Sequence, residues 1–210
     1  MPPIAHPEPD RHSLPLVILA SSSPRRRELF EMAGIRHAVQ PSTVDDGQLD
    51  SGRVRPNHWV GSLAYYKASA AVLGLDEQAR AGAVVLGADT VCVQEGLIIG
   101  QPVDRADAGR IIRTMAGNTH EVLTGVALIN AETGQREIFV DRSVVTVGEL
   151  TDKQIETYLD SGDWQGKAGA YNITERLAAG WPITFEGDET SIVGLPMTRT
   201  LERIAAFARR

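Results

Sequence analysis

Short apolar runs separated by polar turns that contain glycine dominate the pattern along this chain. Runs of about five apolar residues are typical of buried strands, and apolar residues spaced three to four positions apart are typical of helices. The pattern predicts strands at 16–20, 37–41, 84–88, 91–93, 98–99, 122–130 and 137–147, and helices at 24–33, 59–73, 104–115, 151–159 and 196–208. Because helices alternate with strands and hairpin turns are mixed in, we predict an α/β fold with a mixed sheet flanked by helices.

The first residues differ in composition from the rest. Met1 to Leu14 contains four prolines among charged residues, and it lacks the apolar core of a signal peptide. We therefore expect 1–14 to be a poorly ordered leader, and 15–210 to form one domain of a protein that is not exported.

Composition and charge narrow the classes of function. The chain has 210 residues, of which 42% are hydrophobic, enough for a large core. No stretch approaches the ~20 apolar residues of a membrane-spanning helix, so no membrane association is expected. A net charge of −6 argues against broad binding to nucleic acid. The single cysteine, Cys92, lies in an apolar run and favours a reducing, cytoplasmic location.

The segment from Ser21 to Leu29 is the most informative for chemistry. A strand leads into a serine-rich turn that opens a helix, where free backbone N–H groups and the helix dipole favour a phosphate. Arg25 and Arg26 follow in the first turn, where cations are unfavourable unless an anion neutralises them. A plain Ser23 cap with a solvated basic turn explains these residues equally well.

A carboxylate and two lysines are further candidates. Asp89 ends an apolar strand, where it could bind Mg²⁺ or orient a water, although capping of a turn is commoner for a lone aspartate. Lys167 lies in a glycine-rich loop that is not a Walker A motif, because Ala168 replaces the required serine or threonine. Lys67 by itself is only a lysine on a predicted helix.

The remaining polar residues do not predict a metal or catalytic site. Asp45, Asp46 and Asp50 fit no EF-hand spacing and are explained by a solvated acidic loop. No Cys/His cluster has the spacing of a zinc site. His120 begins a predicted strand, and we expect it to be structural. No Gly-x-Ser-x-Gly turn supports a serine hydrolase.

Taken together, these segments resemble the Maf family of nucleotide pyrophosphatases. The matching motifs occur in order from Leu16 to about Leu201. They are Ser21-x-Ser23-Pro24-Arg25-Arg26-x-Glu28-Leu29, Lys67-Ala68, Gly87-Ala88-Asp89-Thr90, His120-x-Val122-x-Thr124-Gly125-Val126, Gly166-Lys167-Ala168-Gly169-Ala170-Tyr171 and Val193-Gly194-Leu195-Pro196.

The resemblance implies an elongated α/β fold, similar to inosine triphosphate pyrophosphatase, with a central nucleotide-binding cleft in one Maf-like catalytic domain over 15–210. It also implies a homodimer. By position, Asp89 matches the family's catalytic acidic residue, and a divalent cation, Mg²⁺ or Mn²⁺, is expected on Asp89 and Asp46. The positions that would bind the triphosphate are Ser21, Ser23, Arg25, Arg26, Lys67 and Lys167. The implied reaction converts a nucleoside triphosphate to a monophosphate and pyrophosphate.

The chain departs from the family pattern at three places. Gln101 stands where a lysine is usual, which removes one positive charge from the expected phosphate site, with Arg105 a candidate replacement. Asp46 stands where glutamate is usual and is one methylene shorter. After Tyr171, Asn172-Ile173-Thr174-Glu175 stands where Gly-Ile-Gln-Gly is usual.

Substrate choice rests on a few of these positions. Arg25 and Thr90 resemble the branch that prefers dTTP and UTP, in which Thr174 would bind the base. Because the usual glutamine is missing at Thr174, its hydrogen bond to a pyrimidine is lost or supplied by Glu175, and modified nucleotides are an alternative substrate. A non-catalytic nucleotide-binding regulator of cell division is the alternative function. Gln101 favours that alternative slightly, and retention of Asp89 opposes it.

Overall fold

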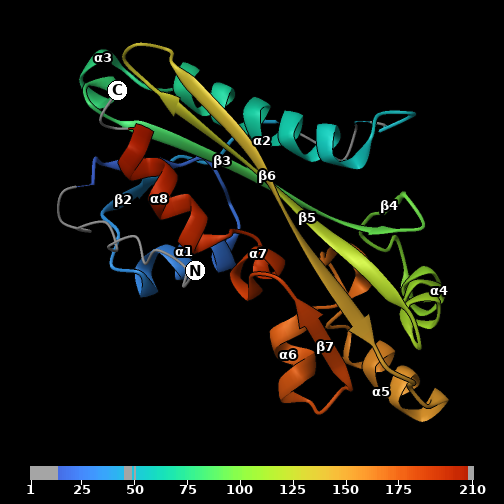
Figure 1. The fold of residues 1–210 in the computed structure, drawn as a ribbon. Helices are drawn as coiled ribbons and strands as arrows, with labels where there is room; N and C mark the ends of the chain where they lie inside the picture. Colours follow the sequence, from blue (N-terminus) through green and yellow to red (C-terminus); the bar gives the residue numbers. More distant parts are fainter. Residues whose placement is uncertain (1–13, 45–48, 50, 208–210) are drawn as a thin grey trace, which may run out of the picture.

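The structure is a computed structural model that describes residues 14–44, 49 and 51–207. In these residues a seven-stranded mixed sheet is flanked by helices (Figure 1). The strands, in their order across the sheet, are β2 (His37–Val39), β1 (Val17–Leu19), β3 (Val84–Gln94), β5 (Thr119–Asn130), β6 (Arg136–Val147) and β7 (Ile183–Glu186), and β4 (Leu97–Ile99) pairs with the far end of β3. Strand β1 runs parallel to β2 and β3, and the other pairs are antiparallel. The predicted α/β class with a mixed sheet is confirmed.

Helices cover both faces of the sheet. They are α1 (Pro24–Met32), α2 (Pro56–Leu73), α3 (Glu77–Arg80), α4 (Arg105–Met115), α5 (Asp152–Ser161), α6 (Ile173–Ala178), α7 (Glu189–Val193) and α8 (Met197–Phe207), with a short 3-10 turn at Ala168–Ala170. Side chains of a strand point alternately to its two faces. Leu86 and Ala88 of β3 therefore pack with α1 and α8, whereas Val85 packs with α2 on the other face. In Figure 1, α2 lies along the long strands, with α1 and α8 across from it.

A second apolar cluster forms the other end of the molecule. Helices α4, α5 and α6 and strand β7 pack there against the far ends of β3, β5 and β6. The long antiparallel strands run through both parts, which gives the elongated shape in Figure 1. No helix in the part of the chain that the structure describes is long and apolar enough to cross a membrane.

Two glycines let α2 lie unusually close to the sheet. A Cβ at Gly87 would lie 2.2 Å from the carbonyl oxygen of Ala64, and a Cβ at Gly125 would lie 2.4 Å from that of Val60. Only glycine fits between a strand and a helix backbone at such distances. The close approach brings Lys67 of α2 over the middle of β3.

The structure differs from the sequence-based prediction in several elements. The strands predicted at 84–88 and 91–93 are one strand, because Asp89 and Thr90 continue the ladder opposite Gly125 and Thr124. Helix α2 begins at Pro56 rather than Trp59, with proline in the first turn. The short elements α3, α6, α7 and β7 were not predicted. The predicted leader falls on residues that, apart from Leu14, lie outside the described part.

The edge of β3 facing β1 has a gap. Strand β1 pairs with β3 only as far as Leu86, and β4 joins the same strand at Cys92. Among the described residues, no strand pairs with β3 between these two points on this edge. Functional groups in open α/β sheets gather beyond the carboxyl end of a strand where its neighbour diverges. The residues after β1 and the middle of β3 therefore face one opening.

Candidate functional site

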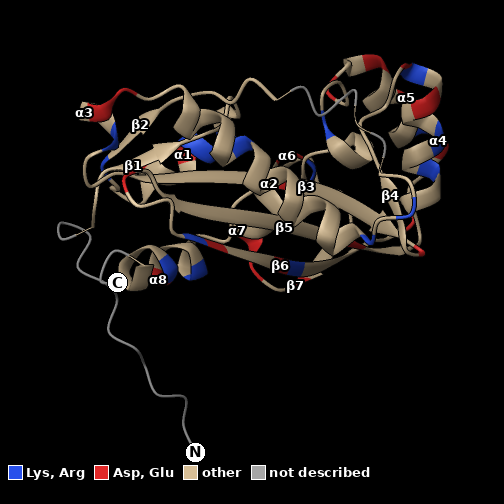
Figure 2. Ribbon diagram, turned by 90° about the horizontal axis from the view of Figure 1, so that it is seen from above, with Lys and Arg blue, Asp and Glu red and all other residues tan. Residues whose placement is uncertain are grey.

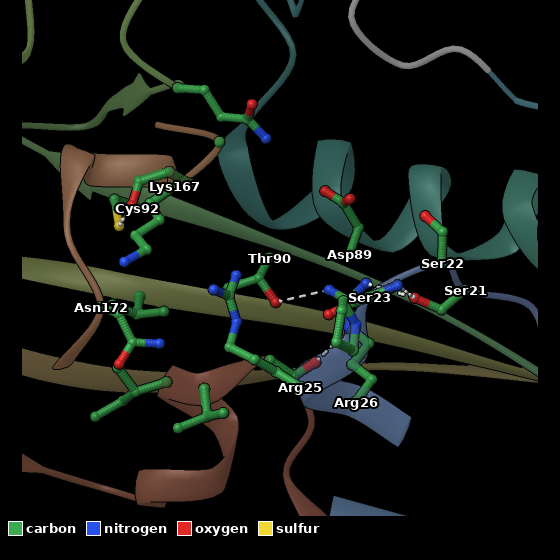
Figure 3. Close-up of a pocket in the computed structure, with 18 of the residues that line it drawn as sticks. Ser21, Ser22, Ser23, Arg25, Arg26, Asp89, Thr90, Cys92, Lys167 and Asn172 are labelled. Carbon is green, nitrogen blue, oxygen red and sulfur yellow. Dashed lines mark hydrogen bonds between the residues drawn. The ribbon is translucent and has the colours of Figure 1, made fainter. Parts of the chain in front are cut away.

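A cavity of about 470 Å³ occupies the gap beside β3 (Figure 3). Its walls come from the turn between β1 and α1, from α2, from the middle of β3, from the glycine-rich loop before α6 and from the end of α7. The predicted site residues that line it are Ser21, Ser23, Arg25, Arg26, Lys67, Asp89, Thr90 and Lys167. Residues 146 positions apart in the sequence are thus brought around one space.

The serine-rich turn at 21–23, together with Arg25 and Arg26, lines one end of the cavity, and these residues are called the cradle. Ser23 occupies the N-cap position of α1, but its side chain makes no capping hydrogen bond. Instead, the Ser21 hydroxyl accepts a hydrogen bond from the Ser23 backbone N–H at 3.2 Å. The first turn of α1 carries no acidic residue and holds the arginines drawn in blue in Figure 2. Because the Ser23 cap is absent, this geometry favours an anion site over a plain helix cap.

Arg26 ties the cradle to three other segments. Its Nε donates to the carbonyl oxygen of Gly194 at 2.8 Å, its Nη1 to the Ser21 hydroxyl at 3.3 Å and its Nη2 to the Thr90 hydroxyl at 3.1 Å. A planar guanidinium with donors in a fixed fork can hold several such acceptors at once. Arg26 therefore fixes the turn after β1 against β3 and against the segment after α7.

A chain of hydroxyls extends from Arg26 through the sheet. Thr124 on β5 is fully buried, and its hydroxyl donates to the carbonyl oxygen of Ser191 at 2.8 Å. The Thr90 hydroxyl, 2.9 Å away, must therefore donate to Thr124, because a threonine hydroxyl has one proton. Thr90 is then left as an acceptor for Arg26. The Ser191 carbonyl can only accept, and it therefore sets the direction of each hydrogen bond from Arg26 through Thr90 to Thr124.

Lys67 and Asp89 form a nearly buried ion pair above β3. The Nζ of Lys67 lies 2.7 Å from Oδ1 of Asp89, and the two side chains are 14% and 10% exposed. Asp89 points to the α2 face of the sheet, whereas its neighbour Thr90 points to the α1 face. The strand edge thus presents a carboxylate and a hydroxyl on opposite sides of the same opening.

Asp89 also suits a divalent cation. Mg²⁺ prefers oxygen ligands, and one or two carboxylates completed by substrate phosphates and waters are its usual protein environment. The described residues contain no cluster of three or more His, Cys, Asp or Glu side chains that could hold a metal ion on its own. Asp46, the other expected metal ligand, lies outside the described residues, as does Asp45.

The glycine-rich loop brings Lys167 to the opposite end of the cavity. Its ammonium group pairs with the Glu175 carboxylate, and its side chain is 14% exposed. Gly169 has φ of +71°, and a Cβ there would lie 2.7 Å from Sγ of Cys92. Glycine is required here because the backbone is left-handed and because any Cβ would collide with the Cys92 sulfur. Burial raises the pKa of the Cys92 thiol to about 12, so this thiol stays protonated.

The wall behind this loop is aromatic. Tyr171 lines the cavity, and its hydroxyl lies 2.9 Å from Nε2 of His120, which is 2% exposed. Burial lowers the pKa of His120 to about 4, so the ring is neutral at neutral pH. Tyr171 also stacks on Trp181. In this arrangement His120 supports the cavity wall, in line with the structural role expected for it.

Two expected positions lie outside the cavity lining, and several lining residues were not predicted, Asn172 among them. Thr174 is exposed on the first turn of α6 and is not among the residues that line the cavity. Arg105 pairs with Glu156 and Asp160 at the surface and does not line the cavity either, whereas Gln101 does. Asn172 lines the cavity and was not predicted, although an asparagine before a short helix is a recognisable N-cap signal.

A family model and several curated relatives indicate one family. A family model described as "Maf-like protein" matches residues 16–207. A protein of Moorella thermoacetica named dTTP/UTP pyrophosphatase is 41% identical over 194 residues, which cover 91% of this chain and 94% of that protein. A protein of Bacillus cereus with the same name is 35% identical over 206 residues, which cover 97% of this chain and 96% of that protein. The solved structure of the Staphylococcus aureus Ham1 protein overlaps 63% of this chain and 71% of its own, with a TM-score of 0.41 and 13% identity.

Proposed function

The chain belongs to the family of Maf-like proteins, and from this premise we propose that it hydrolyses dTTP and UTP to the nucleoside monophosphate and pyrophosphate. Relatives at 35–41% identity over nine-tenths or more of the chain carry the name dTTP/UTP pyrophosphatase. The observation that supports the activity best is the pairing of an anion cradle with a nearly buried carboxylate around one cavity. The non-catalytic alternative finds no support in these relatives.

In this proposal, two groups of residues divide the reaction between them. The hydroxyls and N–H groups of the turn at 21–23, with Arg25, Arg26 and Lys67, bind the triphosphate. Water attacks the α phosphorus, the bond to the bridging oxygen breaks, and negative charge accumulates on the departing pyrophosphate. Fixed positive groups stabilise that charge most in the transition state, where it is largest. Arg26 is well suited to this role because its position is fixed by Gly194 and Thr90.

Asp89 has the remaining role of placing the water and the cation. Aspartate is a weak general base at neutral pH, so we assign Asp89 as a metal ligand that also orients the attacking water. A bound Mg²⁺ or Mn²⁺ would supply further neutralisation of phosphate charge. Lys67 lies against the same carboxylate and can reach toward a phosphate when the triphosphate binds.

The proposal also covers the cellular location, the domain organisation and the oligomeric state of the protein. A buried free thiol at Cys92 suits a reducing compartment, which supports a cytoplasmic location. We propose that 15–210 forms one catalytic domain, because the family model matches residues 16–207. The homodimer that the resemblance implies remains a prediction, which size-exclusion chromatography with light scattering would check.

The function is tested by release of pyrophosphate from a panel of triphosphates with Mg²⁺ or Mn²⁺. The panel contains dTTP, UTP, 5-methyl-UTP, CTP, GTP and 7-methyl-GTP. We expect turnover of dTTP and UTP, with pyrophosphate and monophosphate formed in equal amounts. Release of orthophosphate in place of pyrophosphate would contradict the bond assignment, and no turnover of any nucleotide would contradict the enzyme assignment.

Arg26→Lys tests the anion cradle. Lysine keeps the charge but loses the fork that holds Ser21, Thr90 and Gly194 together. We expect KM for UTP to rise about tenfold or more, as for loss of a charge-assisted contact of about 1.4 kcal/mol or more. Arg27→Lys, on the same turn but exposed and paired with Glu31 at 3.9 Å, is the matched control. A steady-state titration in which both variants match the wild type would refute this role of Arg26.

Gln101→Lys tests the departure from the family pattern. Gln101 lines the cavity, and Arg105 is held at the surface by Glu156 and Asp160, so it does not replace the missing charge. We expect the added lysine to lower KM for UTP by about threefold to tenfold, because a cation at a partly solvated phosphate site contributes about 1 kcal/mol. The measurement is KM at two ionic strengths, and the gain should shrink at high salt. An unchanged KM at low salt would show that position 101 does not face a phosphate.

A further inference from the structure

Asn172 has a fixed orientation at the edge of the cavity. It is 8% exposed and occupies the N-cap position of α6, where its Oδ1 accepts a hydrogen bond from the Glu175 backbone N–H at 3.0 Å. A backbone N–H can only donate, so the atom facing the helix must be the amide oxygen and not the nitrogen. The capping hydrogen bond therefore fixes Oδ1 toward the helix and leaves Nδ2 pointing away from it.

The end that faces the cavity is the amide nitrogen. Figure 3 shows the Asn172 side chain with its nitrogen directed into the cavity and its oxygen turned away. Within the described residues, the capping bond is the only hydrogen bond of this side chain, and nothing accepts from Nδ2. Asn172 thus presents a donor that cannot exchange places with an acceptor unless the cap is broken. A ligand at this end gains a hydrogen bond only if it offers an acceptor.

The position of Asn172 indicates which part of the nucleotide it meets. In Figure 3 the serine turn, Arg26 and Asp89 lie at one end of the cavity, and Asn172 and Lys167 lie at the other. Apolar side chains near Asn172 also line the cavity, namely Ile173, Ile192 and Val193. Apolar walls with a few oriented polar groups suit a flat base. With the triphosphate in the cradle, the base extends to the Asn172 end.

We propose that Asn172 selects the base, by donating from Nδ2 to the O4 carbonyl of uracil or thymine. This inference rests on the function proposed above. Cytosine has an amino group in place of that carbonyl. Two donors would then face each other, and the Asn172 oxygen is not available to accept because it caps α6. A site that reads a carbonyl by a fixed donor discriminates against the amino analogue, since both polar groups would be left unpaired.

Asn172→Asp separates base reading from the stability of the helix. Aspartate caps helices as well as asparagine does, so the bond to the Glu175 N–H is retained while the donor becomes a carboxylate oxygen. We expect kcat/KM for UTP to fall about tenfold or more, because the carboxylate oxygen cannot donate to O4 and leaves that carbonyl unpaired. The value for CTP should fall less or rise, because its amino group can donate to the new acceptor. The readout is therefore the UTP to CTP ratio of kcat/KM.

Asn172→Ser is the neutral companion variant. Serine also caps the helix, but it introduces no charge and removes the amide donor. We expect the UTP to CTP ratio to fall in this variant too, mainly through loss of UTP turnover. Thermal unfolding of both variants should match the wild type, because the cap is kept.

The outcomes distinguish this inference from the proposed function. An unchanged UTP to CTP ratio of kcat/KM in Asn172→Asp would overturn base reading by Asn172, even if both values fall. If the wild type releases no pyrophosphate from any nucleotide, the proposed function fails. Calorimetric titration of UTP and CTP into the wild type and Asn172→Asp would then test base reading alone: a preference for UTP that the substitution removes supports it, and equal affinities in the wild type refute it.

Discussion

Asp89→Asn is expected to reduce pyrophosphate release from UTP by roughly 100-fold or more, as for loss of a group that acts on the reacting water. Nucleotide binding should largely survive, because the cradle of Ser21, Arg25 and Arg26 is separate from the carboxylate. The amide has nearly the same shape but carries no charge for a cation or for Lys67, which lies 2.7 Å from Oδ1. The measurement is kcat from steady-state release, together with the Kd of UTP by calorimetry.

Asp152→Asn is the matched control for this substitution. Asp152 is an exposed carboxylate in the first turn of α5, remote from the cavity lining. Its asparagine variant should keep wild-type kcat. Near wild-type kcat in Asp89→Asn as well would refute the central role given to this carboxylate.

Gly87→Ala is expected to cause a large loss of stability. The added Cβ would lie 2.2 Å from the carbonyl oxygen of Ala64 and 2.7 Å from the backbone nitrogen of Ala68, so α2 must move away from β3. Such overpacking costs about 3 kcal/mol, which lowers Tm by about 6–12 °C in a protein of this size. Activity should fall as well, since α2 carries Lys67. Thermal unfolding followed by circular dichroism gives Tm, and the UTP assay gives activity.

Gly61→Ala provides a control within the same helix. A Cβ at Gly61 would lie 3.5 Å from methyl groups of Ile138 and Val140, which is ordinary van der Waals contact. Alanine is also favoured over glycine inside a helix by about 1 kcal/mol. We expect an unchanged or higher Tm for Gly61→Ala. A wild-type Tm for Gly87→Ala would contradict the close approach of α2 to the sheet.

The sequence was sufficient for the fold class and for the charged residues and serines of the serine turn, α2, β3 and the glycine-rich loop that line the cavity. The long elements were predictable because each carries its own apolar pattern, as β5 and α4 do. Strand β3 was divided in two because Asp89 and Thr90 interrupt that pattern, although their backbones continue to pair with β5. The polar residues sit there because this edge of the strand faces the cavity.

Other features depend on contacts that no local pattern contains. The hydroxyl chain from Thr90 to Ser191 joins positions 101 residues apart, and neither end indicates its partner. Thr174 was expected to bind the base by its place in a motif, but the first turn of α6 directs it to solvent. Asn172 takes the cavity position instead, because the cap fixes its amide between the helix and the open space. The direction of a side chain within a short helix is decided by packing, which the sequence shows only indirectly.

The central claim is that water attacks the α phosphorus and that the bond between the α and β phosphates breaks. Hydrolysis of UTP in water enriched in oxygen-18, followed by mass spectrometry of both products, tests this most directly. The heavy oxygen should appear in UMP and be absent from pyrophosphate. Label in pyrophosphate, or in orthophosphate released beside UDP, would contradict the mechanism built on Asp89 and the serine and arginine cradle.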